Sequence, residues 1–452
     1  TVESTRGGHG MKFPWEADIP SRWDQIPLKY LTISTTGGTP DKSNSQFWGG
    51  DIPWVSSKDM DTTSISDTED YISQNAIEQG EAKLVPEGTL LIVSRSGILE
   101  HSIPVAVTDT EVAINQDIRA YIPTNKRISG EFLRDFIIGF EDELLQIWRQ
   151  QGATVQSLNS EAVSQTPFPV PDRSQERQIV SYSKTVTSLI LDAKQHIEEM
   201  ILLLKERKKS AISYHVAGSE KVDWKKDIHQ FIRSELPNEW DRAKLRWVTN
   251  KIGSGSTPDG GSEAYVEEGI KFIRSQNVTE MGLQLADIVY IDQKTHQEMN
   301  STQVHAKDVL LNITGASLGR TSVVPNEITS ANVNQHVCII RPIQQHIVPE
   351  YLNYVLESVI GQRQIFANQT GASREAVTFS QIGDFEVPLP PISEQKRIIQ
   401  QVDSMVTNIH TSINHLKAIS ELLEEKRQAL ITAAVTGQID VSKEKGVIQG
   451  DD

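Results

Sequence analysis

The chain contains few of the residue patterns that support covalent catalysis. Neither a G-x-x-x-x-G-K-[ST] phosphate loop nor an H-E-x-x-H pair occurs. The single cysteine, Cys338, excludes a cysteine cluster for zinc, and its apolar surroundings favour a place in the core. The glycine-rich stretch from Gly253 to Pro258 ends in proline, which indicates a surface loop rather than a cofactor loop. We therefore expect no catalytic residues, no metal and no cofactor in this chain.

The chain does contain groups of side chains that can read the edges of DNA bases. Arginine and lysine suit guanine, asparagine and glutamine suit adenine, and serine and threonine assist in the major groove. Such residues gather where strands are expected to end. The candidates for DNA contact are Ser57, Lys58, Arg95, Ser96, Asn115, Gln116, Arg149, Gln150, Arg274, Gln276, Asn277, Thr314, Arg320, Asn334, Gln335 and Arg374.

The landmarks around these candidates occur twice, in the same order. Gly37-Gly38-Thr39-Pro40 is matched 218 residues later by Gly255-Ser256-Thr257-Pro258, and Asn115-Gln116 is matched 219 residues later by Asn334-Gln335. A period this long exceeds the roughly 20 to 50 residues of solenoid repeats, so it indicates two whole domains. Two similar but non-identical readers suggest a ligand with two sites.

The repeat leaves two interpretations open for its shared asparagines. Asn115 and Asn334 can fix a turn through an Asx hydrogen bond instead of contacting a base. Positions that differ between the halves, such as Lys58 against Val278, are better candidates for sequence choice because two half-sites usually differ.

Each half is expected to form short strands and one helical stretch before a proline-rich segment. The apolar runs predict strands at 52–56, 89–94, 103–107, 270–274, 309–314 and 337–341. Apolar spacing near 3.6 residues predicts helices over 130–150 and 349–364. Prolines then punctuate 167–171 and 388–391, and Ser174 and Ser393 are suited to cap the helices that follow.

A heptad pattern after each proline segment is the clearest physical signal in the chain. The seam consists of Ile190, Ile197, Leu204 and Ala211 in the first copy and Ile409, Leu416, Leu423 and Leu430 in the second, with Ala193, Met200 and Ile419 at intermediate positions. A narrow apolar stripe with charged flanks is typical of a coiled coil. Each helix should run for some 40 residues, about 60 Å. We expect the copies to pair with one another, the alternative being that each packs on its own domain.

Antiparallel pairing would relate the two blocks by a pseudo-twofold axis at opposite ends of a rigid spacer. Two readers related in this way meet duplex DNA in opposite senses. The natural ligand is then a bipartite target, in which two short half-sites are separated by unread base pairs. One turn of the duplex is about 34 Å.

The bulk properties limit how such a protein could bind DNA. The net charge of −16 argues against coating of nucleic acid by bulk electrostatics, so a local basic face or basic partners would be needed. No apolar run approaches the roughly 20 residues that span a bilayer, so no membrane association is expected. A single cysteine indicates a reducing compartment, the cytoplasm. Residues 1–10 look like a disordered or added lead-in, and Met11 could be the natural start.

The duplicated phrases resemble the specificity (S) subunits of type I restriction–modification systems over nearly the whole chain. The resemblance rests on Gly37–Pro40 followed by Trp48-Gly49-Gly50-Asp51-Ile52-Pro53-Trp54-Val55, on Ile114-Asn115-Gln116-Asp117, and on Pro388-Leu389-Pro390-Pro391-Ile392-Ser393-Glu394-Gln395-Lys396-Arg397-Ile398. The last phrase, which runs into the heptad helix, is the most specific of the three.

The resemblance implies an α+β fold class with a pseudo-twofold internal repeat. Two similar globular target recognition domains would be joined by two long helices that form an antiparallel coiled coil. The predicted divisions are an N-terminal lead-in at 1–21, target recognition domain 1 at 22–172, a central helical region at 173–220, target recognition domain 2 at 221–391, a C-terminal helical region at 392–437 and a tail at 438–452.

The resemblance also implies a non-catalytic subunit, in which each domain reads one half of a split site in double-stranded DNA. The helices would set the spacing and dock two methyltransferase (M) subunits, which hold S-adenosylmethionine and flip the target base. Restriction (R) subunits would add cleavage driven by ATP and Mg. The alternatives are a coiled-coil adaptor that binds only proteins and an orphan remnant of such a system.

Overall fold

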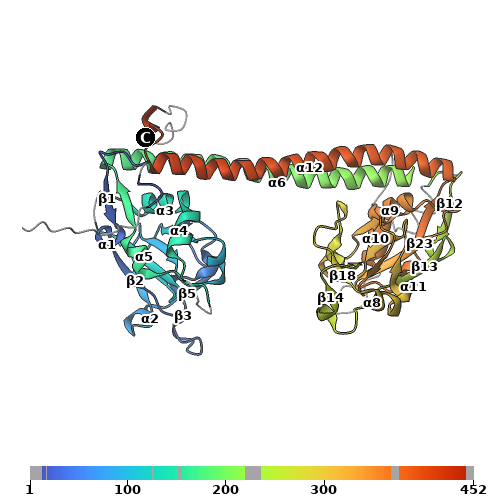
Figure 1. Cartoon of the computed structure of the whole chain (residues 1–452), viewed down its shortest axis with the longest axis horizontal. Coiled ribbons are helices and arrows are strands. Elements are labelled where there is room, and N and C mark those ends of the chain that lie inside the picture. Colours follow the sequence, from blue (N-terminus) through green and yellow to red (C-terminus); the bar gives the residue numbers. More distant parts are fainter. Residues whose placement is uncertain are drawn as a thin grey trace, which may run out of the picture. The chain divides into compact units, whose positions relative to one another are not determined.

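The computed structural model of the chain describes residues 13–16, 18–124, 127–150, 155–218, 236–367 and 376–443. It divides into two compact units. The first unit comprises Thr1–His196 with Ile419–Asp452, and the second comprises Ile197–Ala418. Each unit therefore contains one globular domain and a part of each long helix (Figure 1).

The two long helices begin and end close to the predicted bounds. Helix α6 spans Arg173–Ala217 and helix α12 spans Ile392–Val435, which are 45 and 44 residues. The predicted serine cap of α6 is wrong, because Asp172 Oδ1 accepts the hydrogen bonds from the backbone N–H groups of Ser174 and Gln175, both 3.0 Å long. A carboxylate at this place also suits the positive end of the helix dipole.

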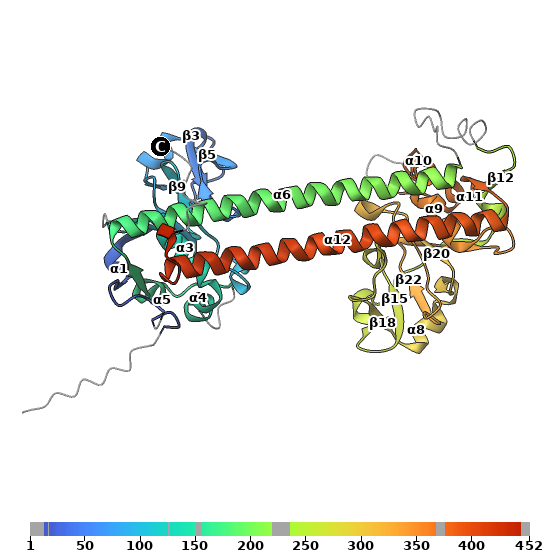
Figure 2. The same cartoon turned by 90° about the horizontal axis from the view of Figure 1, so that it is seen from above.

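The helices pair antiparallel within each unit, as the heptads predict. In the first unit, Ile190 of α6 packs in one hydrophobic core with Leu423 and Leu430 of α12, and Lys194 Nζ lies 2.8 Å from Glu424 Oε2. In the second unit the end of α6, at Ile212 and Val216, shares a core with the start of α12, at Ile398 and Val402. Figure 2 shows the two helices side by side in each unit.

The seam itself is only partly as predicted. Ile190, Ile197 and Ile409 are buried, and Leu204, Ala211, Leu416, Leu423 and Leu430 are partly buried. The prediction that Met200 and Ile419 belong to the seam is wrong, since the two residues are 50% and 46% exposed. Ile212 and Ile431, one residue beyond Ala211 and Leu430, are fully buried instead. A straight helix of 3.6 residues per turn drifts against a strict heptad, which accounts for this shift.

The helix ends also pack on the domains, so the alternative of separate packing holds in part. In the first unit, Ile179, Tyr182 and Val186 of α6 share one core with Ile431 and Val435 of α12 and with the globular domain. Each unit is thus stabilised by a three-way contact between two helices and a domain.

The domain of the first unit consists mainly of two mixed sheets. One has the order β2-β10-β7-β8-β4, with bounds Thr32–Thr36, Ile118–Pro123, Leu90–Val93, Val105–Thr108 and Ser64–Ile65. The other has the order β5-β3-β9-β6, with bounds Asp70–Ile72, Trp48–Val55, Val112–Ile114 and Lys83–Val85. The predicted helix over 130–150 is present as α3, Gly130–Gly139, and α4, Glu141–Trp148. Shorter helices are α1, Leu28–Leu31, α2, Gln74–Glu78, and α5, Ser160–Gln165.

The domain of the second unit repeats this plan with changes at the edges. One sheet has the order β13-β23-β20-β21, with bounds Thr249–Ser254, Val337–Pro342, Val309–Asn312 and Thr321–Val323. The other has the order β14-β18-β15-β22-β19, with bounds Tyr265–Val266, Val289–Ile291, Ile270–Ile273, Ala331–Val333 and Gln303–Val304. A separate hairpin joins β16, Val278–Thr279, to β17, Gly282–Leu283. The helices of the domain are α8, Gln293–Glu298, α9, Pro349–Glu357, α10, Val359–Ala367, and α11, Phe379–Gly383.

The proline-rich segments are short strands. Strand β11, Pro167–Val170, pairs antiparallel with β1, Asp24–Pro27, and β24, Glu386–Leu389, pairs with β12, Asp241–Lys244. Both form two-stranded sheets, where every strand is an edge and a proline without an N–H group is tolerated.

The predicted lead-in at 1–21 overlaps the core of the first unit. Trp15 is fully buried, packs edge-to-face on Phe136 with ring centroids 5.2 Å apart, and donates from Nε1 to the carbonyl oxygen of Pro167. Residues 1–10 lie outside the described residues. The structured domain therefore includes at least part of the predicted lead-in.

Equivalent buried side chains in the first turn of each long helix attach it to its domain. Glu176 Oε1 accepts hydrogen bonds from the backbone N–H and the hydroxyl of Ser129, which caps α3. Gln395 accepts from the N–H of Val348, which precedes α9, and donates to the carbonyl oxygens of His346 and Pro390. The starts of α6 and α12 are thereby fixed to their own domains.

Candidate nucleic-acid interface

In the first unit, three of the predicted segments leave the sheets at the same end. Strands β3 and β9 are parallel, with Val55 opposite Ile114, so the turn after each strand emerges at one edge. The turn after β7 joins them, because Ser94 N–H donates to the carbonyl oxygen of Asp117 at 2.7 Å. A fourth segment, Gly37–Pro40, is attached through Gly38 N–H, which donates to the carbonyl oxygen of Ile114 at 3.0 Å.

The second unit brings the equivalent segments together by similar bonds. Strands β15 and β22 are parallel, with Ile273 opposite Val333. Ile313 N–H, after β20, donates to the carbonyl oxygen of His336 at 3.0 Å, and Gly255 N–H donates to that of Val337 at 3.2 Å. We call this four-segment surface the recognition edge. It consists of 37–40, 56–59, 94–97 and 115–117 in the first unit, and of 255–258, 274–277, 313–316 and 334–336 in the second.

One glycine in each unit makes this convergence sterically possible. A Cβ atom on Gly37 would lie 1.7 Å from the carbonyl oxygen of Ile114, and one on Gly255 would lie 1.7 Å from that of Val333. Neither glycine has a positive φ, so the requirement is for close backbone approach rather than for a left-handed conformation. The recurrent glycine of the sequence pattern is explained by this contact.

The shared glutamines are exposed at the recognition edge, and their orientation is fixed. Thr39 donates its hydroxyl hydrogen to Gln116 Oε1, and Thr257 donates to Gln335 Oε1 at 2.5 Å. The amide oxygen is therefore occupied in each unit. The NH₂ group of Gln116 lies 3.5 Å from Asp117 Oδ2, whereas that of Gln335 lies 3.1 Å from His336 Nε2.

Neither of these two neighbours, Asp117 and His336, is among the candidates for DNA contact that the sequence predicts. His336 is held on its other side by Thr314, with 2.6 Å between Oγ1 and Nδ1, so Thr314 is engaged within the recognition edge. An alignment of the two halves would reveal this difference, because Asp117 and His336 each follow the shared Asn-Gln pair.

Further predicted residues of the first unit lie at or beside the recognition edge. Arg95 and Arg149 are exposed. Arg95 forms an isolated β-bridge with Ser157, and Arg149 forms one with Leu158, which places both arginines beside the turn after β7. Ser96 accepts a hydrogen bond from Ile98 N–H, and Gln150 accepts one from the Ser157 hydroxyl. Ser57 and Lys58 are exposed on a short 3-10 helix, Ser57–Asp59, where Lys58 forms an ion pair of 3.6 Å with Glu69.

The predicted correspondence of Lys58 with Val278 between the two halves is wrong. Each 3-10 helix at this place is closed by a capping residue, Asp59 in Ser57–Asp59 and Asn277 in Ser275–Asn277. Lys58 therefore corresponds to Gln276, which is exposed. The pair still differs in type, a lysine against a glutamine.

Two predicted contacts are buried and hold the edge together instead. Asn115 is 6% exposed, and its Oδ1 accepts from the N–H groups of Asp117 and Ile118, which is the Asx alternative. Asn277 is 2% exposed and bonds Arg274 N–H and the carbonyl oxygen of Gln284. The prediction of base contact is therefore wrong for both. Asn334, which is partly exposed, also bonds its turn through His336 N–H at 3.2 Å.

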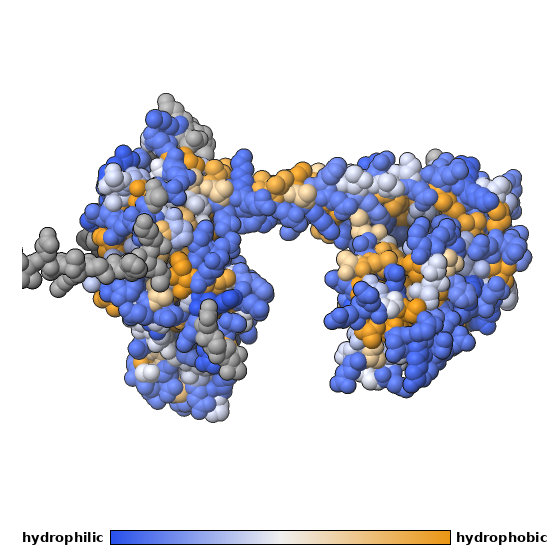
Figure 3. Space-filling model, viewed as in Figure 1, coloured by the Kyte–Doolittle hydropathy of each residue, from blue (hydrophilic) through white to orange (hydrophobic). Residues whose placement is uncertain are grey.

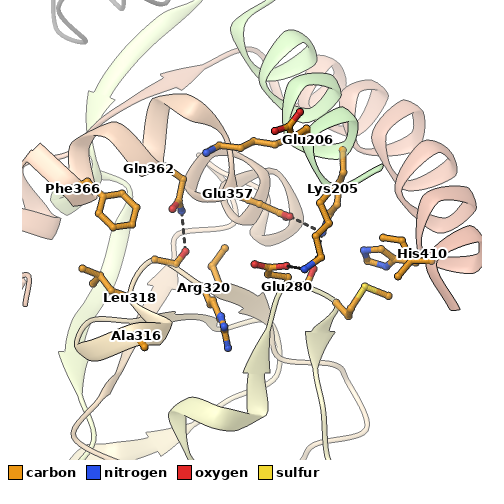
Figure 4. Close-up of a pocket in the computed structure, with 16 residues that line it drawn as sticks. Lys205, Glu206, Glu280, Ala316, Leu318, Arg320, Glu357, Gln362, Phe366 and His410 are labelled. Atoms are coloured by element: carbon orange, nitrogen blue, oxygen red, sulfur yellow. Dashed lines mark hydrogen bonds and ion pairs between the residues drawn. The ribbon is translucent and has the colours of Figure 1, made fainter. Parts of the chain in front are cut away.

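Three predicted residues of the second unit remain, Arg274, Arg320 and Arg374. Arg274 is partly exposed and donates to the carbonyl oxygen of Asp287 at 2.8 Å. Arg320 lies between β20 and β21 and is among the residues that line a cavity beside α6 (Figure 4). Arg374 lies outside the described residues.

The surface chemistry of the domains is mostly polar. In the face shown in Figure 3, each domain is largely hydrophilic, with scattered apolar residues. In the described residues, no group of three or more His, Cys, Asp or Glu side chains is arranged to hold a metal ion. Cys338 is buried, and burial raises the pKa of its thiol to about 12. None of the described helices has the length and apolar character needed to cross a membrane.

Comparison with known proteins identifies the class to which this architecture belongs. The family model for the type I restriction modification DNA specificity domain matches twice, at residues 20–203 and 237–421. The chain therefore belongs to the type I restriction modification DNA specificity family, and it is a non-catalytic DNA-recognition subunit.

Individual relatives agree with this assignment. The specificity subunit of the type I restriction enzyme MjaIX from Methanocaldococcus jannaschii is 23% identical over 448 residues, covering 96% of this chain and 99% of the relative. The EcoR124I/EcoR124II specificity subunit from Escherichia coli is 34% identical over 145 residues, or 32% of this chain and 36% of the relative. A solved chain of a type I restriction–modification system has a similar fold, with a TM-score of 0.66 and 17% identity, covering 93% of this chain and 99% of the solved one.

Proposed function

We propose that each unit reads one half of a bipartite site in double-stranded DNA through its recognition edge. The observation that carries this proposal is the duplicated convergence of four segments, with a shared scaffold and different exposed side chains. Gly37 and Gly255 build the same backbone contact, whereas Lys58 is replaced by Gln276 and Asp117 by His336. Shared residues thus form the surface, and the residues that differ select the bases.

The chemistry of the differing residues supports different half-sites. Lysine donates to the acceptors of guanine, whereas glutamine suits the donor–acceptor pair of adenine. Asp117 can accept from the exocyclic amine of cytosine or adenine, while an imidazole can donate to a purine acceptor. The two halves of the target are therefore expected to differ in sequence.

The paired helices set the spacing between half-sites and dock two M subunits in this proposal. The helices carry large apolar side chains that the described structure leaves exposed. In the first unit these are Leu189, Leu191, Ile419 and Leu422, and in the second they are Met200, Leu202 and Leu203, between 46% and 64% exposed. Exposed apolar residues in this number are typical of a surface for protein partners.

The partner subunits would supply the chemistry in a cytoplasmic complex. The M subunits would bind S-adenosylmethionine, and R subunits would add activity that depends on ATP and Mg. The chain's charge of −16 supports a division of labour in which basic partners contribute much of the contact with phosphates.

A domain exchange tests this proposal. Residues 22–172 are replaced by the corresponding block of a homologue with a known target, and the chimera is expressed with its M subunit. We expect one half of the methylated motif to change and the other to persist. A change in both halves, or in neither, would contradict the assignment of one domain to one half-site. Failure of the unmodified complex to retain DNA would favour a protein-only adaptor.

A further inference from the structure

A cavity of 420 Å³ in the second unit lies between the long helices and the recognition domain. Its walls come from α6, from α12 at His410, from the turn between β16 and β17 at Glu280, and from α9 and α10 (Figure 4). Lysine and glutamate side chains cross it in pairs. Lys205 Nζ lies 3.0 Å from Glu280 Oε2 at the exposed side of the cavity.

The second pair is buried, and it centres on Lys208 of α6. This lysine is 8% exposed, and its Nζ lies 2.6 Å from Glu357 Oε1 at the end of α9. The same ammonium donates to the backbone carbonyl oxygen of Glu280 at 2.7 Å. Burial raises the pKa of Glu357, and the lysine beside it acts in the opposite direction. A buried ammonium is tolerated only with such partners, so its position is closely defined.

The carbonyl that Lys208 holds belongs to a stiff hairpin. Thr279 Oγ1 donates to the carbonyl oxygen of Gly282 and accepts from Met281 N–H, which closes the turn around Glu280. The hairpin continues directly from the 3-10 helix Ser275–Asn277, and Asn277 bonds Gln284 on the far side of it. A displacement of Glu280 would therefore be transmitted to the segment that carries Gln276.

The first unit does not repeat this arrangement at the equivalent positions. Arg427 of α12 stands in the place of Lys208 and donates to Glu424 on its own helix. Ile138 stands in the place of Glu357. The buried lysine–glutamate contact is thus specific to the second unit among the described residues.

We propose that Lys208 is a positioning residue for the second half-site: by holding the carbonyl of Glu280, it fixes the base-reading segment 274–277 relative to helix α6. The inference rests on the proposed function, since it assigns a role within the reading of DNA. Lys208 contacts no base in this account. Its contribution is to the accuracy with which the second unit discriminates bases.

The test uses the full chain in complex with its M subunit and compares three variants by methylation of DNA libraries randomised in each half-site. Lys208→Met removes the contact but leaves Glu357 buried and unpaired. The double variant Lys208→Met with Glu357→Leu removes both charges, which is often neutral for stability, yet it still lacks the bond to Glu280. Lys209→Met is the matched control, because Lys209 is the next residue on the helix and is exposed.

We expect the double variant to lose discrimination in one half-site by at least about tenfold, the factor for one hydrogen bond to a charged group. Discrimination in the other half-site should be unchanged, and Lys209→Met should match the unmodified protein in both. The proposal is overturned if the double variant reads the second half-site normally, if both half-sites relax equally, or if Lys209→Met has the same effect. Absence of a bipartite target in the unmodified complex would instead overturn the proposed function itself.

Discussion

At the scale of single residues, the recognition edge depends on backbone atoms that lie closer than a side chain would allow. A Cβ atom on Gly255 would collide with the carbonyl of Val333, whereas one on Gly253, two residues earlier, would meet no heavy atom of a non-neighbouring residue within 4 Å. The two glycines thus differ in what an added methyl group would meet.

We predict that Gly255→Ala destabilises the second unit by about 1–3 kcal/mol, because the methyl group is forced against backbone that cannot rotate away. Discrimination in the second half-site should fall as the 255–258 loop moves from Gln335. Gly253→Ala should change neither property. Thermal unfolding and methylation of half-site libraries measure both; equal behaviour of the two variants would contradict the close-approach explanation.

His410 lines the cavity beside Lys208. Burial lowers the pKa of His410, and the charge of Lys208 lowers it further. The unfolded state, with a pKa near 6.5, then binds a proton more readily than the folded state. Stability from this group is present above that value and is lost as the pH falls toward the lowered pKa.

We therefore expect the melting temperature to drop less between pH 7.5 and pH 5.5 in His410→Gln than in the unmodified protein. Glu357, with a raised pKa, acts in the opposite sense in both proteins, so the comparison isolates the histidine. Identical pH profiles would show that His410 does not contribute.

Residue roles were the least predictable part of the site. The sequence pattern indicates the right turns, because arginine, asparagine and glutamine follow the strands. It does not show that Asn115 and Asn277 point inward, since an asparagine that fixes a turn and one that reads a base have the same composition signal. Nor does it place Arg320 in the cavity, which depends on the path of α6.

At the scale of elements, the helices were predicted well because heptads report directly on which face is buried. The bounds of α6 and α12 follow from apolar spacing and from the prolines before them. The drift from Ala211 to Ile212 could not be read from a strict heptad, because it accumulates along a real helix. The proline segments were not predicted as strands, since pairing with β1 and β12 is a long-range event.

The seam of helix α12 buries one residue and leaves the residue before it at the surface. Ile409 is 6% exposed, whereas its neighbour Asn408 is exposed. Ile409→Asp places an unpaired carboxylate in the seam and should cost at least about 3 kcal/mol. Asn408→Asp adds the same charge at the surface and should cost little. Chemical denaturation compares them, and equal losses would argue that the seam is not desolvated.

At the scale of the whole molecule, the duplication organises both structure and function. Each unit combines a domain with parts of both helices, so neither linear half of the chain folds around its own helix alone. The division into two readers was predictable from the 218-residue offset. The presence of parts of both helices in each unit follows from the antiparallel pairing that we predicted.

The charge of the whole chain leads to a prediction about partners. At −16 the isolated chain should retain DNA weakly. Addition of the M subunit should increase affinity and steepen its salt dependence, because each phosphate contact contributes a slope of about −0.9 on a double-logarithmic plot. Fluorescence anisotropy over a salt series checks this; tight, steeply salt-dependent binding by the isolated chain would contradict it.

The most direct measurement of the central claim is methylome sequencing of cells that express this chain with its M subunit. The account predicts one methylated motif composed of two specified half-sites of different sequence, separated by a fixed number of unspecified base pairs. A continuous motif, or no new methylation in the presence of an active M subunit, would contradict it.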